Sequence, residues 1–487
     1  MCIRDRINHL PARTVLVNFH ESPPLYKKFF DVLPQTVDIS TFEVINSIEK
    51  DNQTLIETKD INQEVVLCAK WVKGISQKFP HAHIGILAPD KNLYKEKFYS
   101  KFAASCALIY SIRFLDFTII AWLLTNISDN PASIGALVFV KFIPMMFSGL
   151  ITGWLVDKFS RLAIIKFVII SHSIYLMSWA SYMLFFSVNI EVIFLMTFIS
   201  GILMSIDISS RISYLSSLLK RRVIRSGIAA NVIFLNLAWF IGPNIGMFFL
   251  ELSSSAILYT SLSLINILGL LFLRKIPSLN ILKYKKETYS GFIAGINFAK
   301  KKPIILGTLL IVGFGNLTAF TFESMGPYFA KFIYEASPKE FSFMISCQGL
   351  GALIGSIFLF PMLVKITRPG FVFFIATIFL CTGSIIFSYS TSFFIGCIIL
   401  IILGAGTTFF MNMHSRILIT QTPNPLRGRV GGLQQFGISL FPIGSLITGL
   451  LGDRLGVPVT IRIIAILGIL CLLVIFFLFR DLKNIIE

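Results

Sequence analysis

Five ionisable side chains interrupt long apolar stretches of this sequence, and their types could do chemistry. Asp116 follows Arg113 by three positions, and Arg211 follows Asp207 by four. Glu323 lies near the end of a later stretch. These spacings permit intrahelical ion pairs. Burial in an apolar cavity raises the pKa of a carboxylic acid toward neutrality, as a proton carrier requires. All five are therefore proton-coupling candidates, and the alternative for each pair is a static ion pair.

The elements that must hold these side chains are long, continuously apolar segments. A membrane-spanning helix needs roughly 20 apolar residues. The chain is 55% hydrophobic and only 14% charged. Lipid requires helices here, because each backbone polar group must be satisfied within the segment. We predict twelve such helices, at approximately 102–125, 132–156, 162–185, 192–214, 227–250, 256–273, 303–325, 342–364, 371–389, 393–415, 431–451 and 457–479.

The loops predict the symmetry and orientation of this bundle. The longest connection, residues 274–302, is rich in lysine and separates six predicted helices from six. That pattern is typical of a duplicated transporter, with halves at 98–273 and 303–487. Most basic residues after position 100 fall on one side if the N-terminus is cytoplasmic, so both termini are expected in the cytoplasm.

The loop between the second and third runs carries a first motif. It reads Gly153-Trp-Leu-Val-Asp157-Lys158-Phe-Ser-Arg161 and resembles the loop signature of the major facilitator superfamily, although serine replaces the usual glycine at position 160. The resemblance implies a latch between conformations, made by an acid near a helix end and a cation. The alternative is an ordinary positive loop.

A second motif lies in the fifth run. Gly242-Pro243-Asn-Ile-Gly246 resembles the signature of exporters that exchange substrate for protons, with Gly349, Gly351 and Gly355 of run eight as its complement. Small residues permit close helix approach, and proline removes one backbone hydrogen bond. The resemblance implies a tight contact between runs five and eight that could seal an outer gate. The alternative is generic small-residue packing.

A third motif refines the resemblance. The loop Arg427-Gly428-Arg429, followed by Phe441-Pro442-Ile-Gly444-Ser445, is similar to the branch that includes enterobactin exporters and macrolide or multidrug exporters. The likeness covers about residues 98–480. It implies export of small organic molecules driven by protons, although the two arginines of the loop could simply set orientation.

The first hundred residues have a different character. Residues 1–6 resemble a translated sequencing adaptor, and we predict that they are an artefact. Residues 7–97 predict a soluble α/β appendage, with strands at 14–19 and 83–87 and a helix at 63–78. Residues 64–90 resemble part of an inactivated helicase-like DNA-repair protein, without a phosphate-binding loop. A chimera of two genes would explain this.

Together these patterns predict an all-α, twelve-helix membrane protein of the major facilitator fold with a small α/β N-terminal segment. The expected function is secondary export of amphipathic drug- or siderophore-like molecules by proton antiport. An importer or lipid flippase is the alternative within transport, and a DNA-repair interaction module fused by misassembly is the alternative outside it. The sequence shows no nucleophile–base set, metal-ligand pair or nucleotide loop. We therefore expect no enzyme activity, cofactor or metal, and no nucleic-acid partner for the membrane part. The expected form is a monomer in the inner membrane.

Overall fold

The computed structural model describes most of the apolar part of the chain and two short strands before it. The described residues are 14–16, 83–85, 91–147, 155, 158–218, 224–252, 254–274, 276, 291–359, 366–423 and 426–479. The chain divides into two compact units, Met1–Tyr94 and Lys95–Glu487.

The first unit contains a parallel pair of short strands. β1 (Thr14–Leu16) pairs with β2 (His83–Gly85), with Val15 opposite Ile84. Both strands fall inside the segments predicted to be strands. The predicted helix at 63–78 lies outside the described residues, so the α/β character of this unit stays a prediction.

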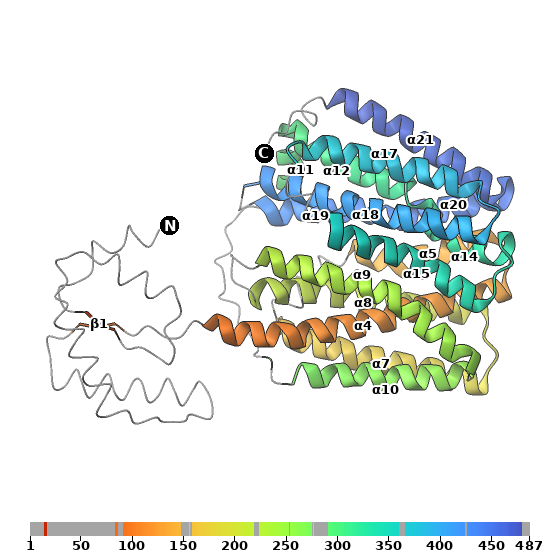
Figure 1. Ribbon diagram of the computed structural model, residues 1–487, viewed down its shortest axis with the longest axis horizontal. Helices are drawn as coiled ribbons and strands as arrows, with labels where there is room; N and C mark the ends of the chain where they lie inside the picture. The colour runs from red at the N-terminus through yellow and green to blue at the C-terminus, as the bar shows by residue number, and fades with distance from the viewer. Residues whose placement is uncertain are drawn as a thin grey trace. The chain divides into compact units, whose positions relative to one another are not determined.

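All the secondary structure in the described residues of the second unit is helical (Figure 1). Its helices are α4 (Lys91–Ile127), α5 (Pro131–Met146), α7 (Arg161–Phe185), α8 (Ile190–Leu218), α9 (Ile224–Leu252), α10 (Ser255–Phe272), α11 (Gly291–Lys301), α12 (Pro303–Thr318), α13 (Thr321–Ser324), α14 (Gly326–Tyr328), the π-helix η3 (Phe329–Ile333), α15 (Pro338–Ile354), the π-helix η4 (Gly355–Leu359), α17 (Pro369–Ser388), α18 (Phe393–Gln421), α19 (Arg427–Ile438), α20 (Phe441–Leu455) and α21 (Val457–Leu478).

Local sequence explains where several of these helices begin. Ser160 caps α7 by accepting a hydrogen bond from the backbone N–H of Ala163. Ser337 and Glu340 form a reciprocal capping box at the start of α15, with proline at its first position. Such caps satisfy backbone N–H groups that have no partner within the helix.

Ten of the helical segments in the described chain are long and apolar enough to cross a membrane. Two further apolar helices, Pro131–Met146 and Asn231–Ile245, are shorter and coincide with the second and fifth predicted runs. The prediction of membrane-spanning helices is thus confirmed at ten positions, and the total of twelve stays a prediction.

Two predicted runs are interrupted, which the apolar pattern alone did not indicate. The seventh continues from α12 through α13 and α14 into η3. The eleventh is divided into α19 and α20. Proline stands at the restart in each case, at Pro327 and Pro442, and its missing N–H and ring disfavour an unbroken helix.

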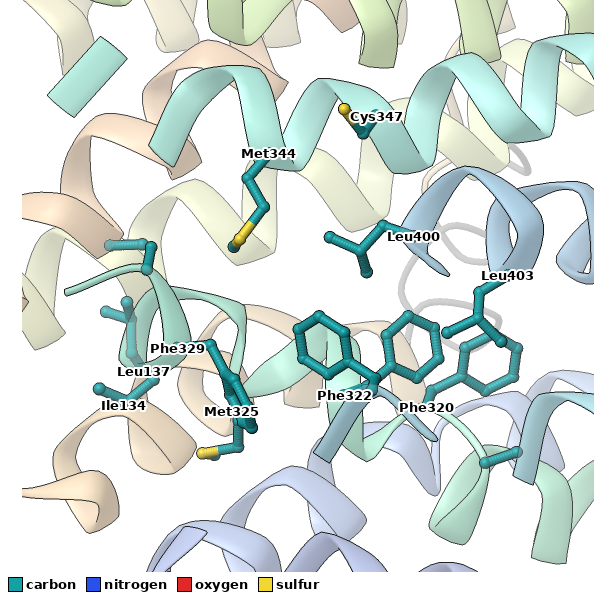
Figure 2. Packing of buried hydrophobic residues seen from close by; sticks show 14 of the residues in the cluster. Ile134, Leu137, Phe320, Phe322, Met325, Phe329, Met344, Cys347, Leu400 and Leu403 are labelled. Atoms are coloured by element: carbon teal, nitrogen blue, oxygen red, sulfur yellow. The ribbon is translucent and has the colours of Figure 1, made fainter. Parts of the chain in front are cut away.

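The helices pack within and between the two sequence halves. Figure 1 shows α7 beside α10 along one edge of this unit and α17 beside α21 along the opposite edge. Between the halves, α5 packs on α20 and α9 on α15. One buried apolar cluster crosses this boundary, and Figure 2 shows Ile134 and Leu137 of α5 near Met325 and Phe329. The two halves therefore share a continuous apolar core.

Candidate functional site

Asp116 is fully buried on α4 and is surrounded by donors from four other helices. The Nζ of Lys141 on α5 lies 3.8 Å from its Oδ2. Tyr259 on α10 donates to Oδ1 at 3.1 Å, and Ser200 on α8 donates to Oδ2 at 3.2 Å. The hydroxyl of Tyr175 on α7 lies 3.2 Å from Oδ2. These contacts compensate the carboxylate for its loss of solvent.

Further hydrogen bonds fix the positions of these donors. Lys141 donates to the hydroxyl of Ser200 at 2.6 Å, so the same serine links the ammonium group and the carboxylate. The indole N–H of Trp179 donates to the hydroxyl of Tyr175 at 3.0 Å. Lys141, Ser200 and Tyr175 are thus each held by more than one polar contact, which keeps their geometry well defined.

Arg113 does not pair with Asp116, as its sequence spacing suggested, but with a residue of another helix. Arg113 Nη1 lies 3.3 Å from Oδ2 of Asp207 on α8, and Arg211 Nε lies 2.7 Å from the same oxygen. The intrahelical spacing of Asp207 and Arg211 thus does produce an ion pair. Arg113 and Asp116 stand on one helix, but their side chains find cross-helix partners that their sequence spacing cannot reveal.

The described residues of the first half consequently include three buried cations and two buried acids. Arg113, Lys141, Asp207 and Arg211 are each at most 5% exposed, and Asp116 is fully buried. Charges within a membrane protein are expensive unless they are paired, and those that persist commonly serve transport or proton transfer. This arrangement allows the Asp116 carboxylate to bind and release a proton. When the proton leaves, Lys141 lies beside the carboxylate as its counter-ion.

The two halves also line an open cavity of about 390 Å³. Its walls combine Trp239 and Asn236 of α9 with Asn316, Glu323 and Asn412 of the second half. A smaller cavity of about 80 Å³ also has Glu323 in its wall. A largely apolar pocket with a few polar groups is typical of a small-molecule site.

Helix α4 separates the charge network from these cavities. Phe114, Phe117, Thr118 and Ala121 recur at helical spacing and line the smaller cavity. Asp116 lies between them in sequence, and its partners belong to helices of the first half. Adjacent positions on α4 therefore face the smaller cavity on one side and the buried ions on the other.

Comparison with known proteins identifies the family. The transmembrane secretion effector family of the major facilitator superfamily matches residues 101–485. The chain belongs to this family. It is therefore a membrane transporter.

Individual relatives agree with this assignment. Two enterobactin exporters, EntS from Shigella boydii serotype 18 and serotype 4, are each 25% identical over 292 residues, covering 59% of this chain and 69% of theirs.

Solved transporter structures share the fold at low sequence identity. A D-xylose–proton symporter matches with a TM-score of 0.61 and 13% identity, covering 78% of this chain and 97% of the symporter. A bacterial homologue of the human lysosomal transporter Spinster matches at 0.59 and 12%, covering 80% and 98%. The nucleoside transporter NupG matches at 0.57 and 15%, covering 79% and 99%.

The loop motifs of the transporter are described only in part. Gly153 and Asp157 lie outside the described residues. Arg161 donates to the backbone carbonyl of Ser213 at 3.0 Å, which ties the start of α7 to α8. No latch contact is therefore assigned to the loop, and its role stays a prediction.

The second loop motif supports the break between α18 and α19. Arg427 Nε donates to the carbonyls of Ile419 and Thr422, both at 3.1 Å. These bonds satisfy carbonyls at the C-terminal end of α18. A Cβ at Gly428 would meet nothing within 4 Å, whereas a Cβ at Gly295 of α11 would lie 3.1 Å from that of Arg429.

The glycines of the exporter-type motif have different neighbours from those predicted. A Cβ at Gly242 would lie 2.6 Å from the carbonyl oxygen of Ser111, so this glycine fits α9 against α4. Pro243 is buried inside α9, and the surroundings of Gly246 lie outside the described residues.

Two of the three complementary glycines of run eight were misassigned. Gly351 and Gly355 face α18, where added Cβ atoms would meet Ile401 and Thr408. Gly349, the first glycine of the same stretch, does approach run five, at Trp239 and Phe240 of α9. Runs five and eight do pack together, but a glycine signals close approach without naming the neighbouring helix.

Several residues of the site were not singled out as site residues from the sequence. Lys141 was not among the proton-coupling candidates, and neither were Ser200, Tyr175 and Tyr259. A polar residue within an apolar run is the available signal, but serine and tyrosine are common in such runs. Trp239 likewise gave no sign that it lines a cavity.

Proposed function

We propose that the transporter exports small amphipathic organic molecules in exchange for protons by alternating access. The family description and the similarity to enterobactin exporters favour export. The observation that carries the proposal is the fully buried Asp116 with its ammonium and hydroxyl partners. Neighbouring residues on another face of the same helix, α4, line a cavity between the halves.

Proton exchange at Asp116 would act on Lys141. A proton on the carboxylate removes the negative charge that holds the ammonium group and thereby weakens their attraction. Lys141 Nζ also lies 5.4 Å from the ring centroid of Phe117, which lines the smaller cavity, and the next residue, Phe142, lines both cavities. A change in the ion pair therefore has a short route to the substrate space.

Contacts between the halves at one end of the bundle support an alternating-access mechanism. Trp122 near the end of α4 stacks on Phe341 of α15 with centroids 5.4 Å apart. Lys331 donates to Asn126 at 3.0 Å. A Cβ at Gly449 of α20 would lie 3.0 Å from the Cα of Gly135. With both termini in the cytoplasm, this closed end faces outward, and breaking these contacts would release substrate outside.

The remaining parts of the proposal concern architecture. We infer twelve spans, formed by the ten long apolar helices and the two shorter ones, in an inner-membrane monomer. The loop carrying Asp157 and Lys158 would stabilise one conformation at the cytoplasmic side. The first unit would not take part in transport, since the family match begins at residue 101.

The decisive experiment is gradient-driven efflux from a host lacking its own pumps. Wild type should lower the accumulation of members of a dye and drug panel and lose this effect when the proton gradient is collapsed. Asp116→Asn should abolish driven efflux while leaving binding of the same substrate in purified protein. Asp129→Asn, an identical change at an exposed residue, is the matched control.

The double variant Asp116→Asn with Lys141→Gln separates proton transfer from simple charge balance. It leaves neither charge buried, so abundance should recover without driven efflux. Driven efflux by this protein would exclude Asp116 as the proton carrier and make Asp207 the next residue to test. Uptake instead of efflux in the wild type would overturn the proposed direction.

A further inference from the structure

The two inter-half cavities meet at a small group of shared wall residues. Both are lined by Phe114, Phe142, Trp239, Glu323 and Phe441. Four of these side chains are aromatic and the fifth is a carboxylate. We call this group the aromatic–Glu323 cage.

Glu323 is accessible at this point because the seventh span is broken there. It lies on the short helix α13, between the end of α12 and Pro327. Its Oε2 accepts a hydrogen bond from Nε2 of Gln348 at 3.0 Å, and the residue is partly exposed. One amide donor orients the carboxylate, and no lysine or arginine lies among the described residues that line the two cavities.

Among the described residues that line the two cavities, Glu323 is the only ionisable one. The buried cations of the first half are engaged elsewhere, Lys141 with Asp116 and Arg113 with Asp207. The wall of the substrate space is therefore electronegative. A charged ligand entering it would be favoured if positive and disfavoured if negative.

The aromatic members of the cage strengthen this preference. Phe114 and Trp239 stack with centroids 5.6 Å apart and an interplanar angle of 5°. Phe142 and Phe441 meet edge to face at 5.6 Å. The faces of aromatic rings attract cations, and cages of this kind recognise quaternary ammonium groups.

We propose that the cage binds the cationic centre of a lipophilic cation, such as a quaternary ammonium or phosphonium compound. Glu323 supplies the counter-charge, the aromatic faces contact the cation, and the apolar walls of the 390 Å³ cavity take the hydrophobic substituents. This inference rests on the proposed export of amphipathic molecules and names their charge.

The test uses two probes of the same shape and opposite charge, tetraphenylphosphonium and tetraphenylborate. Binding of each is measured separately by isothermal titration calorimetry on the purified full chain in a nonionic detergent. The phosphonium should bind at least about tenfold more tightly, a difference of about 1.4 kcal/mol. Equal or tighter binding of the borate would overturn the proposal.

Variants at Glu323 control for interactions of the two probes with the detergent, because those interactions are the same for wild type and variant. Glu323→Gln should weaken phosphonium binding about tenfold and leave borate binding unchanged or improved, whereas Glu323→Asp should retain the preference. Glu191→Gln, the same change at an exposed residue outside both cavity walls, should behave as wild type. Unchanged phosphonium affinity in a folded Glu323→Gln protein would refute the role of the carboxylate.

Variants of one cage ring test the aromatic part. Phe441→Leu should weaken phosphonium binding about threefold to tenfold, whereas Phe441→Tyr should preserve it because the ring face remains. Phe394→Leu alters a surface-exposed ring and is the control. Equal phosphonium affinities of the Phe441→Leu protein and wild type would contradict a role of the aromatic rings in binding.

Binding and transport results can fail independently. Phosphonium selectivity that depends on Glu323, together with absence of driven efflux, would contradict the export function and leave the cage supported. Driven efflux of neutral or anionic substrates with no phosphonium preference would leave export intact and overturn the cage.

Discussion

The two halves of the transporter bury different kinds of side chain. In the first half, Arg113, Asp116, Lys141, Asp207 and Arg211 are all buried and joined by ion pairs. In the described residues of the second half, the buried polar side chains are hydroxyls, amides and His414, without a lysine, arginine, aspartate or glutamate. The two halves thus differ in the chemistry of the side chains that they bury.

The second half is instead held by aromatic rings and close backbone contacts. Phe410 lies edge to face with Phe320 at 5.3 Å and tilted against Phe373 at 5.4 Å. Gly351 and Gly404 bring α15 and α18 into backbone contact. Such packing depends on shape, whereas the first half depends on charge balance. Perturbations should therefore affect the halves in different ways.

The largest effect is expected at Asp207, whose carboxylate faces two guanidinium groups. Asp207→Asn would leave Arg113 and Arg211 buried together without a counter-ion. Breaking a buried ion pair by removing one partner destabilises by about 3–5 kcal/mol, and two cations place this variant at the upper end. Fluorescence-detected size-exclusion chromatography should show loss of folded protein. Wild-type abundance would contradict the importance of charge balance in this half.

A smaller loss of stability is expected when one acid faces one cation. Asp116→Asn should destabilise by about 3 kcal/mol, because Lys141 loses its counter-ion but keeps its bond to Ser200. Adding Lys141→Gln should restore much of the thermal stability in detergent. If the double variant is no more stable than the single one, the two residues are not coupled.

This difference between the halves was only partly predictable from the sequence. The start and end of α7 follow directly from its apolar run and Ser160 cap, and Asp207 and Arg211 could be paired because they share a helix. Lys141 is 25 positions from Asp116, and only helix packing brings them together. The same limit explains why Gly242 was assigned to the wrong neighbouring helix.

In the second half, stability should depend on steric crowding more than on charge. Gly404→Leu would force a side chain against the carbonyl of Gln348 on α15. Overpacking of this kind costs about 1–3 kcal/mol. The thermal unfolding midpoint in detergent should fall, while Gly428→Leu, at a position with no neighbour within 4 Å, should leave it unchanged. A stable Gly404→Leu protein would indicate that α15 and α18 can separate without loss of the fold.

The smallest effect is expected at the contact that joins the halves at the closed end. Lys331 donates to Asn126, and its ammonium lies 5.0 Å from the ring centroid of Trp122. Both interactions are partly exposed, so Lys331→Met should weaken closure by only about 0.5–1 kcal/mol. That is enough to increase the open fraction about twofold to fivefold, since every 1.4 kcal/mol changes an equilibrium tenfold.

Amide hydrogen exchange provides the readout for this last change. The segment 122–131 should exchange faster in Lys331→Met, whereas exchange around the Asp207 cluster should not change, because the substitution touches neither its charges nor its packing. Lys331→Arg keeps a cation over the indole ring and should remain close to wild type. If both segments changed together, the closed end and the buried ions would form one cooperative unit, and the functional division between the halves would have to be abandoned.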